Sequence, residues 1–194
     1  MLSLLTGEIQ TGKTRWLEQA IAYADVSGIT VYGVLTPGIW EERNGAFEKK
    51  GINLLLLPQR RIIPFARPEY DAINELGWTI DGEALRIANS HLEDCRAKAR
   101  AMVKNAPVAS GEKPSEREHV NLLVVDEIGP LELVKNAGFS QAVEIIEEGP
   151  AAGFPNVIAI VRPSLIETAV ERFSRGWGNN IRIIDPQANP TLFL

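Results

Sequence analysis

The chain has 194 residues, of which 45% are hydrophobic and 23% charged, and its net charge is −5. A chain of this size buries enough apolar surface to fold as one globular domain, which we expect to span residues 1–194. The single cysteine, Cys95, excludes an intramolecular disulfide. The acidic balance argues against a protein that coats nucleic acid, so no nucleic-acid partner is expected.

Hydrophobic runs in this sequence are short. None reaches the ~20 residues that span a bilayer, so no membrane partner is expected. The N-terminal run Leu2–Leu5 lacks a basic leader and a long hydrophobic region, which argues against a signal peptide. These features and the single cysteine predict a cytoplasmic protein.

Short apolar runs alternate with segments of helical periodicity along the chain. This alternation is typical of an α/β fold with a mostly parallel central sheet and helices on both faces. The apolar runs are, in chain order, Leu2–Leu5, Ile29–Leu35, Ile52–Leu57, Leu122–Val125, Val157–Val161 and Ile181–Ile184.

Helical periodicity predicts helices over residues 14–25 and 83–103. Cys95 lies on the apolar stripe of the second helix, which favours a buried core cysteine over a nucleophile. Residues 105–119 are polar, contain Pro and Ser, and lack apolar periodicity. We expect them to form an exposed loop within the domain.

A glycine-rich stretch follows the first apolar run and fits the phosphate-binding pattern G-x-x-x-x-G-K-[ST]. Glycines let successive N–H groups point at phosphate oxygens, and the next helix adds the positive end of its dipole. The lysine is expected to contact the β- and γ-phosphates and the threonine hydroxyl to bind Mg²⁺. The predicted nucleotide-binding residues are Gly7, Glu8, Ile9, Gln10, Thr11, Gly12, Lys13, Thr14 and Arg15, with Thr14 also a metal ligand.

Two acids end the fourth apolar run, Leu122–Val125. Ligands of open α/β folds bind at the carboxyl ends of the strands, where these acids are expected to emerge. Asp126 is predicted to be the second metal ligand and Glu127 the general base that polarises an attacking water. The alternative is that the two acids only cap the next turn.

These residues resemble a family of P-loop proteins, the small nucleoside-triphosphatases of the cancer-related type. The resemblance rests on the P-loop at 7–14, on a Thr-Pro turn and Gly-Phe return within 31–47, and on the Asp-Glu-Ile-Gly motif and its Glu-Leu end at 126–133. Residues 76–81 match more weakly. The resemblance implies Mg²⁺-dependent hydrolysis of a nucleoside triphosphate, such as ATP or GTP, to the diphosphate and phosphate.

The resemblance also implies that one strand lies between the P-loop strand and the Asp strand. Here that strand would be Val157–Val161, and Arg162 at its end would point toward the γ-phosphate and stabilise charge in the transition state. The alternative for Arg162 is a surface salt bridge or the start of a helix.

The sequence departs from the family in two places. Glu8 adds a negative charge to the P-loop. After the last strand, residues 185–190 lack the Asn-Arg pair that the family carries there, so no residues are assigned to the nucleotide base.

Two alternative functions also require a bound nucleotide. A small-molecule kinase would use residues 36–70 or 105–119 as an acceptor pocket that excludes water. A nucleotide-switched adaptor would bind a protein partner, which the sequence does not identify.

Two further groups of residues have more ordinary interpretations. Trp177, beside two glycines, is expected to pack on the core more readily than to stack on a base. Arg60, Arg61 and Arg67 are expected to form a solvated basic turn, and the alternative is that they contact a phosphate or a partner.

Overall fold

The computed structural model describes residues 1–8, 11–69, 77–105 and 121–193. The strands are β1 (Leu2–Leu5), β2 (Thr30–Leu35), β3 (Gly38–Arg43), β4 (Ala46–Leu57), β5 (Arg61–Arg67), β6 (Thr79–Ile80), β7 (Asn121–Ile128), β8 (Asn156–Val161) and β9 (Ile181–Ile184). The α-helices are α1 (Lys13–Val26), α2 (Gly82–Asn105), α3 (Pro130–Leu133), α4 (Ser140–Glu148) and α5 (Ile166–Trp177). Short 3-10 turns are η1 (Gly149–Ala152), η2 (Pro163–Leu165) and η3 (Pro190–Phe193).

Five strands form the parallel part of the sheet, in the order β2-β7-β8-β1-β9. The residues of β1, β2, β7 and β8 are almost continuously buried because helices cover both faces, which is why these strands appear in the sequence as unbroken apolar runs. β9, at the edge of the sheet, is only partly buried. β8 lies between β1 and β7. The inserted strand that the resemblance implied is therefore confirmed at Val157–Val161.

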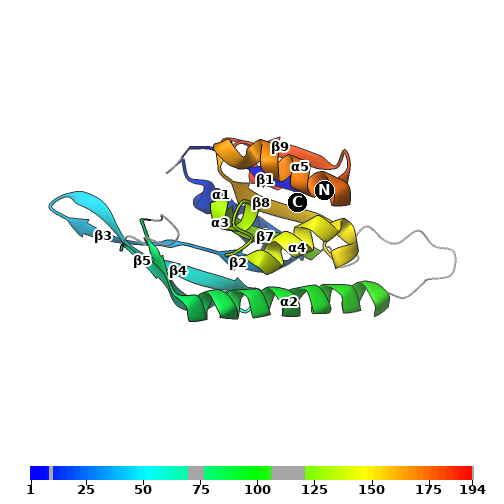
Figure 1. Cartoon of the computed structure of the whole chain (residues 1–194), viewed down its shortest axis with the longest axis horizontal. Coiled ribbons are helices and arrows are strands. Elements are labelled where there is room, and N and C mark those ends of the chain that lie inside the picture. The colour runs from blue at the N-terminus through cyan, green and yellow to red at the C-terminus, as the bar shows by residue number, and fades with distance from the viewer. Residues whose placement is uncertain (9–10, 70–76, 106–120, 194) are drawn as a thin grey trace.

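Strands β3, β4, β5 and β6 form an antiparallel extension that joins the parallel part through β4 and β2. The apolar run Ile52–Leu57, predicted as one strand of a mostly parallel sheet, is the end of the longer β4 and is antiparallel to β2. A parallel neighbour would need a crossover connection of a dozen or more residues, usually a helix. The chain instead forms the hairpin of β3 and β4, which projects away from the helices (Figure 1).

The predicted solvated basic turn at Arg60, Arg61 and Arg67 is wrong in part. All three arginines are exposed and Arg60 lies in a turn, but the other two belong to a strand. Arg61–Arg67 form strand β5, whose central Phe65 is buried. Arg60 forms an ion pair with Asp25, and Arg67 forms another with the nearby Glu69. The three arginines are thus spread along a strand and do not make one cluster.

Helices cover the two faces of the sheet with separate hydrophobic clusters. Apolar residues of α1 pack on one face, and residues of α2, α4 and α5 pack on the other (Figure 1). Neighbouring strand residues alternate between the two clusters, as Leu122 and Leu123 do in β7. The predicted helices 14–25 and 83–103 correspond to α1 and α2, and the three-layer arrangement is confirmed.

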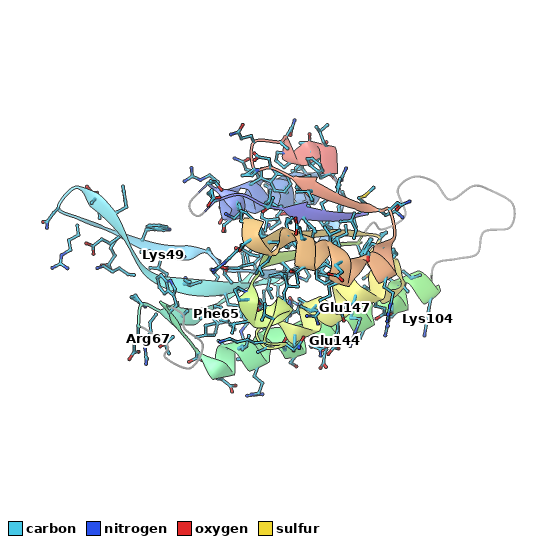
Figure 2. All side chains as sticks on the ribbon, turned by 45° about the horizontal axis from the view of Figure 1, so that its top comes forward. Lys49, Phe65, Arg67, Lys104, Glu144 and Glu147 are labelled. Carbon is cyan, nitrogen blue, oxygen red and sulfur yellow. The ribbon has the colours of Figure 1, made fainter. Side chains whose placement is uncertain are left out.

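Two expected core residues are confirmed. Cys95 is buried on α2, and burial raises the pKa of its thiol to about 11, so it is not a ready nucleophile. Trp177 ends α5, is buried, and donates a hydrogen bond from Nε1 to the carbonyl of Ile146 at 2.7 Å. Its ring belongs to the helical layer that includes α4, on which Glu144 and Glu147 are labelled in Figure 2.

The predicted exposed loop at 105–119 lies outside the described residues, apart from Asn105, which ends α2. Across the described ranges, the structure holds no helix with the length and apolar character needed to cross a membrane.

Candidate active site

The P-loop lies at the carboxyl end of β1, between Leu5 and the first residue of α1, Lys13. Gly12 is the N-cap of α1 and adopts a left-handed backbone conformation with φ of 85°, which a residue with a side chain rarely adopts. The first N–H groups of a helix have no partner within it, so the start of α1 offers donors to an anion. Ile9 and Gln10 lie outside the described residues.

Lys13 lies across the loop. Its ammonium group donates hydrogen bonds to the carbonyl oxygens of Gly7, at 2.7 Å, and of Glu8. Burial lowers the pKa of Lys13, while the negative charges of Glu127, Asp126 and Glu8 act in the opposite direction. The lysine is thus electrostatically coupled to both acids of the Asp-Glu pair, as the predicted site requires.

The segment after β9 packs against the P-loop. A Cβ atom added to Gly7 would lie 3.3 Å from the ring of Pro186, so this close approach favours glycine. Trp16 of α1 donates a hydrogen bond from Nε1 to the carbonyl of Ala188 at 2.6 Å, and its ring lies 5.8 Å from that of Phe193. The sequence did not predict these contacts, because they depend on the placement of β9 beside β1.

Asp126 lies near the end of β7 with only 3% of its surface exposed. One carboxylate oxygen accepts a hydrogen bond from the Thr14 hydroxyl at 3.4 Å, and the other accepts one from the backbone N–H of Thr36 at 3.0 Å. Burial raises the pKa of Asp126, and the hydrogen bonds from Thr36 and Thr14 offset part of this effect. The structure therefore brings the two predicted metal ligands together.

The donor atoms at this point suit Mg²⁺, which prefers oxygen ligands and keeps several waters or substrate oxygens. Among the described residues there is no group of three or more His, Cys, Asp or Glu side chains that could hold a metal. A metal bound here would thus take its protein ligands from Thr14 and Asp126 and its remaining ligands from phosphate oxygens and water.

Glu127 has a left-handed backbone with φ of 80°, which is uncommon for a residue other than glycine. The register of β7 against β8 shifts between Val125 and Ile128, so the backbone leaves the regular ladder at this residue. Its side chain is 46% exposed, in contrast to the neighbouring Asp126. Such a conformation at the end of a strand re-aims a side chain, here out of the sheet.

Arg162 follows β8 and forms an ion pair with Glu127 in which its Nε donates to Oε1 at 2.9 Å. Arg162 also directly precedes η2. These contacts agree with the alternative interpretation of Arg162, in which it forms a salt bridge at the start of a helical turn. The pair nonetheless holds a guanidinium beside the predicted base, and its contact with a γ-phosphate stays a prediction.

Glu132 is a site residue to which the sequence assigned no role. Its buried carboxylate accepts hydrogen bonds from the backbone N–H groups of Gly129, at 2.8 Å, and of Phe139, at 2.9 Å. Burial raises the pKa of Glu132, and these two hydrogen bonds oppose the effect. An acid three residues after a helix N-cap is the local signal that could have identified it.

Comparisons with known proteins agree with this geometry at the level of the fold. No family model matches the sequence, and no curated protein matches it significantly. The solution structure of a human cancer-related nucleoside triphosphatase superposes with a TM-score of 0.58 at 19% identity, covering 98% of this chain and 92% of that chain. The chain has a P-loop NTPase fold.

Proposed function

We propose that the protein is a Mg²⁺-dependent nucleoside-triphosphatase that hydrolyses ATP or GTP to the nucleoside diphosphate and phosphate. The observation that carries the proposal is the hydrogen bond of the Thr14 hydroxyl with the Asp126 carboxylate, which joins the P-loop helix to the acid-bearing strand. The structurally similar human protein is a nucleoside triphosphatase, which supports the same class of reaction.

In this proposal, the P-loop backbone, the N-terminus of α1 and Lys13 bind the phosphates. The two carbonyl oxygens that Lys13 now contacts are weaker partners for an ammonium group than phosphate oxygens are. We expect Lys13 to exchange at least one of them for the β- and γ-phosphates.

Mg²⁺ held by Thr14 and Asp126 would neutralise charge on the phosphate oxygens. The N–H of Thr36 and the hydroxyl of Thr14 orient the Asp126 carboxylate through hydrogen bonds to its two oxygens. A carboxylate fixed in this way needs little rearrangement when it binds its partner.

Glu127 is the proposed base. Its exposed carboxylate would accept a proton from water while the water oxygen attacks the γ-phosphorus. Arg162, which now holds the same carboxylate, would turn to the γ-phosphate oxygens as substrate binds, and so would release Glu127 and stabilise the transition state.

The test is phosphate release with ATP, GTP, CTP and UTP, each with and without Mg²⁺. Glu127→Gln should lower turnover by about 10²- to 10⁴-fold and keep nucleotide binding, because only the proton acceptor is lost. Lys13→Ala should lose binding itself. Glu41→Gln, which changes an exposed glutamate on β3, is the matched control and should behave as wild type.

Two results would contradict parts of the proposal. Undiminished turnover in Glu127→Gln would show that another group activates water. Absence of hydrolysis with all four nucleotides and Mg²⁺ would show that the protein is not a triphosphatase.

A further inference from the structure

A pocket of about 110 Å³ lies beside the acids at the end of β7. Its polar lining residues are Asp126, Glu127 and Arg162, together with Thr36 and the buried Glu132. The remaining lining is mostly apolar and comes from the antiparallel extension, from α2 and from the turn after β7. Its principal apolar lining residues are Phe65, Ala66, Trp78, Ile80, Leu85 and Phe139.

The apolar walls are held by backbone and ring contacts. Ala66 of β5 pairs with Ile80 of β6, so the two residues lie side by side in the ladder. The Phe65 ring stacks on the Phe139 ring with centroids 5.4 Å apart, at the place where the antiparallel extension meets the helical layer (Figure 2). The N–H of Phe139 is itself fixed by the buried Glu132 carboxylate.

α2 contributes the remaining wall because its start is fixed. The backbone N–H of Ala84 donates to the Asp81 carboxylate at 2.8 Å, and the N–H of Leu85 donates to the Asp81 carbonyl at 3.0 Å. Asp81 also donates its own N–H to the Phe65 carbonyl at 2.8 Å. These hydrogen bonds join the start of α2 to the antiparallel extension, and the Asn89 amide of α2 donates to the Gly138 carbonyl of the turn after β7 at 2.9 Å.

The volume and the polarity of the pocket indicate which kind of group fits it. An apolar cavity of about 150 Å³ accommodates a benzene ring, so this pocket suits a group no larger than one small ring. Its polar lining residues offer carboxylate oxygens, which accept a hydrogen bond from a hydroxyl group. Arg162 is the single cation in the described lining and is paired with Glu127, so an anionic occupant would lack a free counter-charge.

We propose that the pocket binds a small apolar alcohol as a second substrate and that the site transfers the γ-phosphate to it, an inference that rests on the proposed triphosphatase chemistry. The alcohol oxygen attacks the γ-phosphorus and forms a new P–O bond. The bond from the γ-phosphorus to the β,γ-bridging oxygen breaks, and its electron pair leaves with the nucleoside diphosphate. The hydroxyl proton passes to the Glu127 carboxylate, and no redox partner is required.

The test uses the full chain with ATP, Mg²⁺ and isobutanol, a branched alcohol smaller than benzyl alcohol, as the probe, and measures ADP and inorganic phosphate separately. Hydrolysis alone gives equal amounts of the two products. Transfer gives more ADP than phosphate, and we expect the ratio to rise at least twofold at saturating alcohol, with isobutyl phosphate detected by mass spectrometry.

Ala66→Leu should fill the pocket and return the ratio to one. The ratio is the readout, so a changed overall rate in this variant does not affect the conclusion. Ala46→Leu places the same change at the exposed tip of the antiparallel extension and should keep the wild-type ratio. If Ala66→Leu does not fold, Leu85→Phe makes the same test from α2.

Equal ADP and phosphate at every alcohol concentration would overturn the acceptor site and leave the triphosphatase proposal standing. An excess of ADP that survives both pocket-filling variants would overturn the assignment of this pocket. No ADP with or without alcohol would overturn both proposals together.

Discussion

The parallel part of the sheet and the antiparallel extension differ in how they are buried and in what they contribute. Of the parallel strands, β1, β2, β7 and β8 are buried on both faces, and the parallel part brings the predicted P-loop, Asp126 and Glu127 to one edge. The antiparallel extension leaves Trp40 and Phe47 49% and 71% exposed, and reaches the site only through the pocket wall. The proposed hydrolysis and the proposed acceptor binding therefore depend on different parts of the sheet.

Asp126→Asn should have the largest effect and tests whether hydrolysis depends on the parallel part. Loss of the carboxylate should lower phosphate release at least about 100-fold, because a metal ligand contributes several kcal/mol to catalysis. The same change should raise the melting temperature at pH 7 without nucleotide or Mg²⁺, since burial raises the pKa of Asp126. Phosphate assays and thermal melts measure the two effects.

The sign of the stability effect follows from protonation. Well below the unfolded-state pKa of about 4, Asp126 is protonated in both states, and stability is lost as the pH rises through the higher folded-state pKa. Asparagine does not ionise and keeps an oxygen for the Thr36 N–H. A lower melting temperature in Asp126→Asn at pH 7 would contradict this account.

Arg162→Gln should have the second-largest effect. Phosphate release should fall by about 100-fold, as for other groups that stabilise transition-state charge. The unfolding free energy should change by no more than about 1 kcal/mol, because the ion pair with Glu127 is half exposed. Arg60→Gln removes the similarly exposed pair with Asp25 and is the matched control. Equal effects of the two variants on phosphate release would count against a catalytic role for Arg162.

Glu132→Gln tests the turn that links the parallel part to the pocket. The amide offers one oxygen to the two N–H donors of Gly129 and Phe139, so we expect a loss of about 1–3 kcal/mol in unfolding free energy. Burial raises the pKa of Glu132, so wild type loses stability as the pH rises from the unfolded-state value of about 4.3 through the higher folded-state pKa. The glutamine variant does not ionise at this position, so the difference in unfolding free energy between the two proteins should become smaller over this pH range.

Denaturant titrations of wild type and Glu132→Gln between pH 4 and pH 8 would measure this difference. Glu167→Gln, which changes an exposed residue of α5, is the control. A gap between wild type and Glu132→Gln that widens with pH would contradict the assigned direction of the pKa shift.

Phe47→Ser should have the smallest effect. Phe47 is 71% exposed near the tip of the antiparallel extension, so its loss should change the unfolding free energy by no more than about 0.5 kcal/mol. Phosphate release should stay at the wild-type level. A clear drop in hydrolysis would show that the tip takes part in the reaction, and would remove the division between the two regions.

The parallel part could be predicted well from the sequence because four of its five strands, β1, β2, β7 and β8, are buried on both faces. Such strands are unbroken apolar runs, and the P-loop marks the strand that precedes it. The antiparallel extension was harder to predict. β3 contains Glu41 and Glu42, and β5 contains Pro64 and two arginines, so neither resembles a buried strand. A proline is tolerated in β5 because the ladder with β4 is irregular near it.

Within the candidate site, the sequence predicted the residues of its two motifs and their approach to each other. It did not predict the N–H of Thr36 as a partner of Asp126. That contact arises because β2 and β7 pair with Val34 opposite Val125, a register that brings the next residues of both strands together. The role of Glu132 likewise depends on how the chain returns at Phe139, seven residues later.

The backbone of Glu127 has a consequence for how this protein would respond to selection for stability. A non-glycine residue in the left-handed region costs of order 1–2 kcal/mol, which Glu127→Gly would largely recover. A stabilisation screen that scores only folding should therefore enrich glycine at position 127, whereas a screen for turnover should retain glutamate. Sequences recovered from the two screens would separate at this one residue, and the position would thereby reveal which property had been selected.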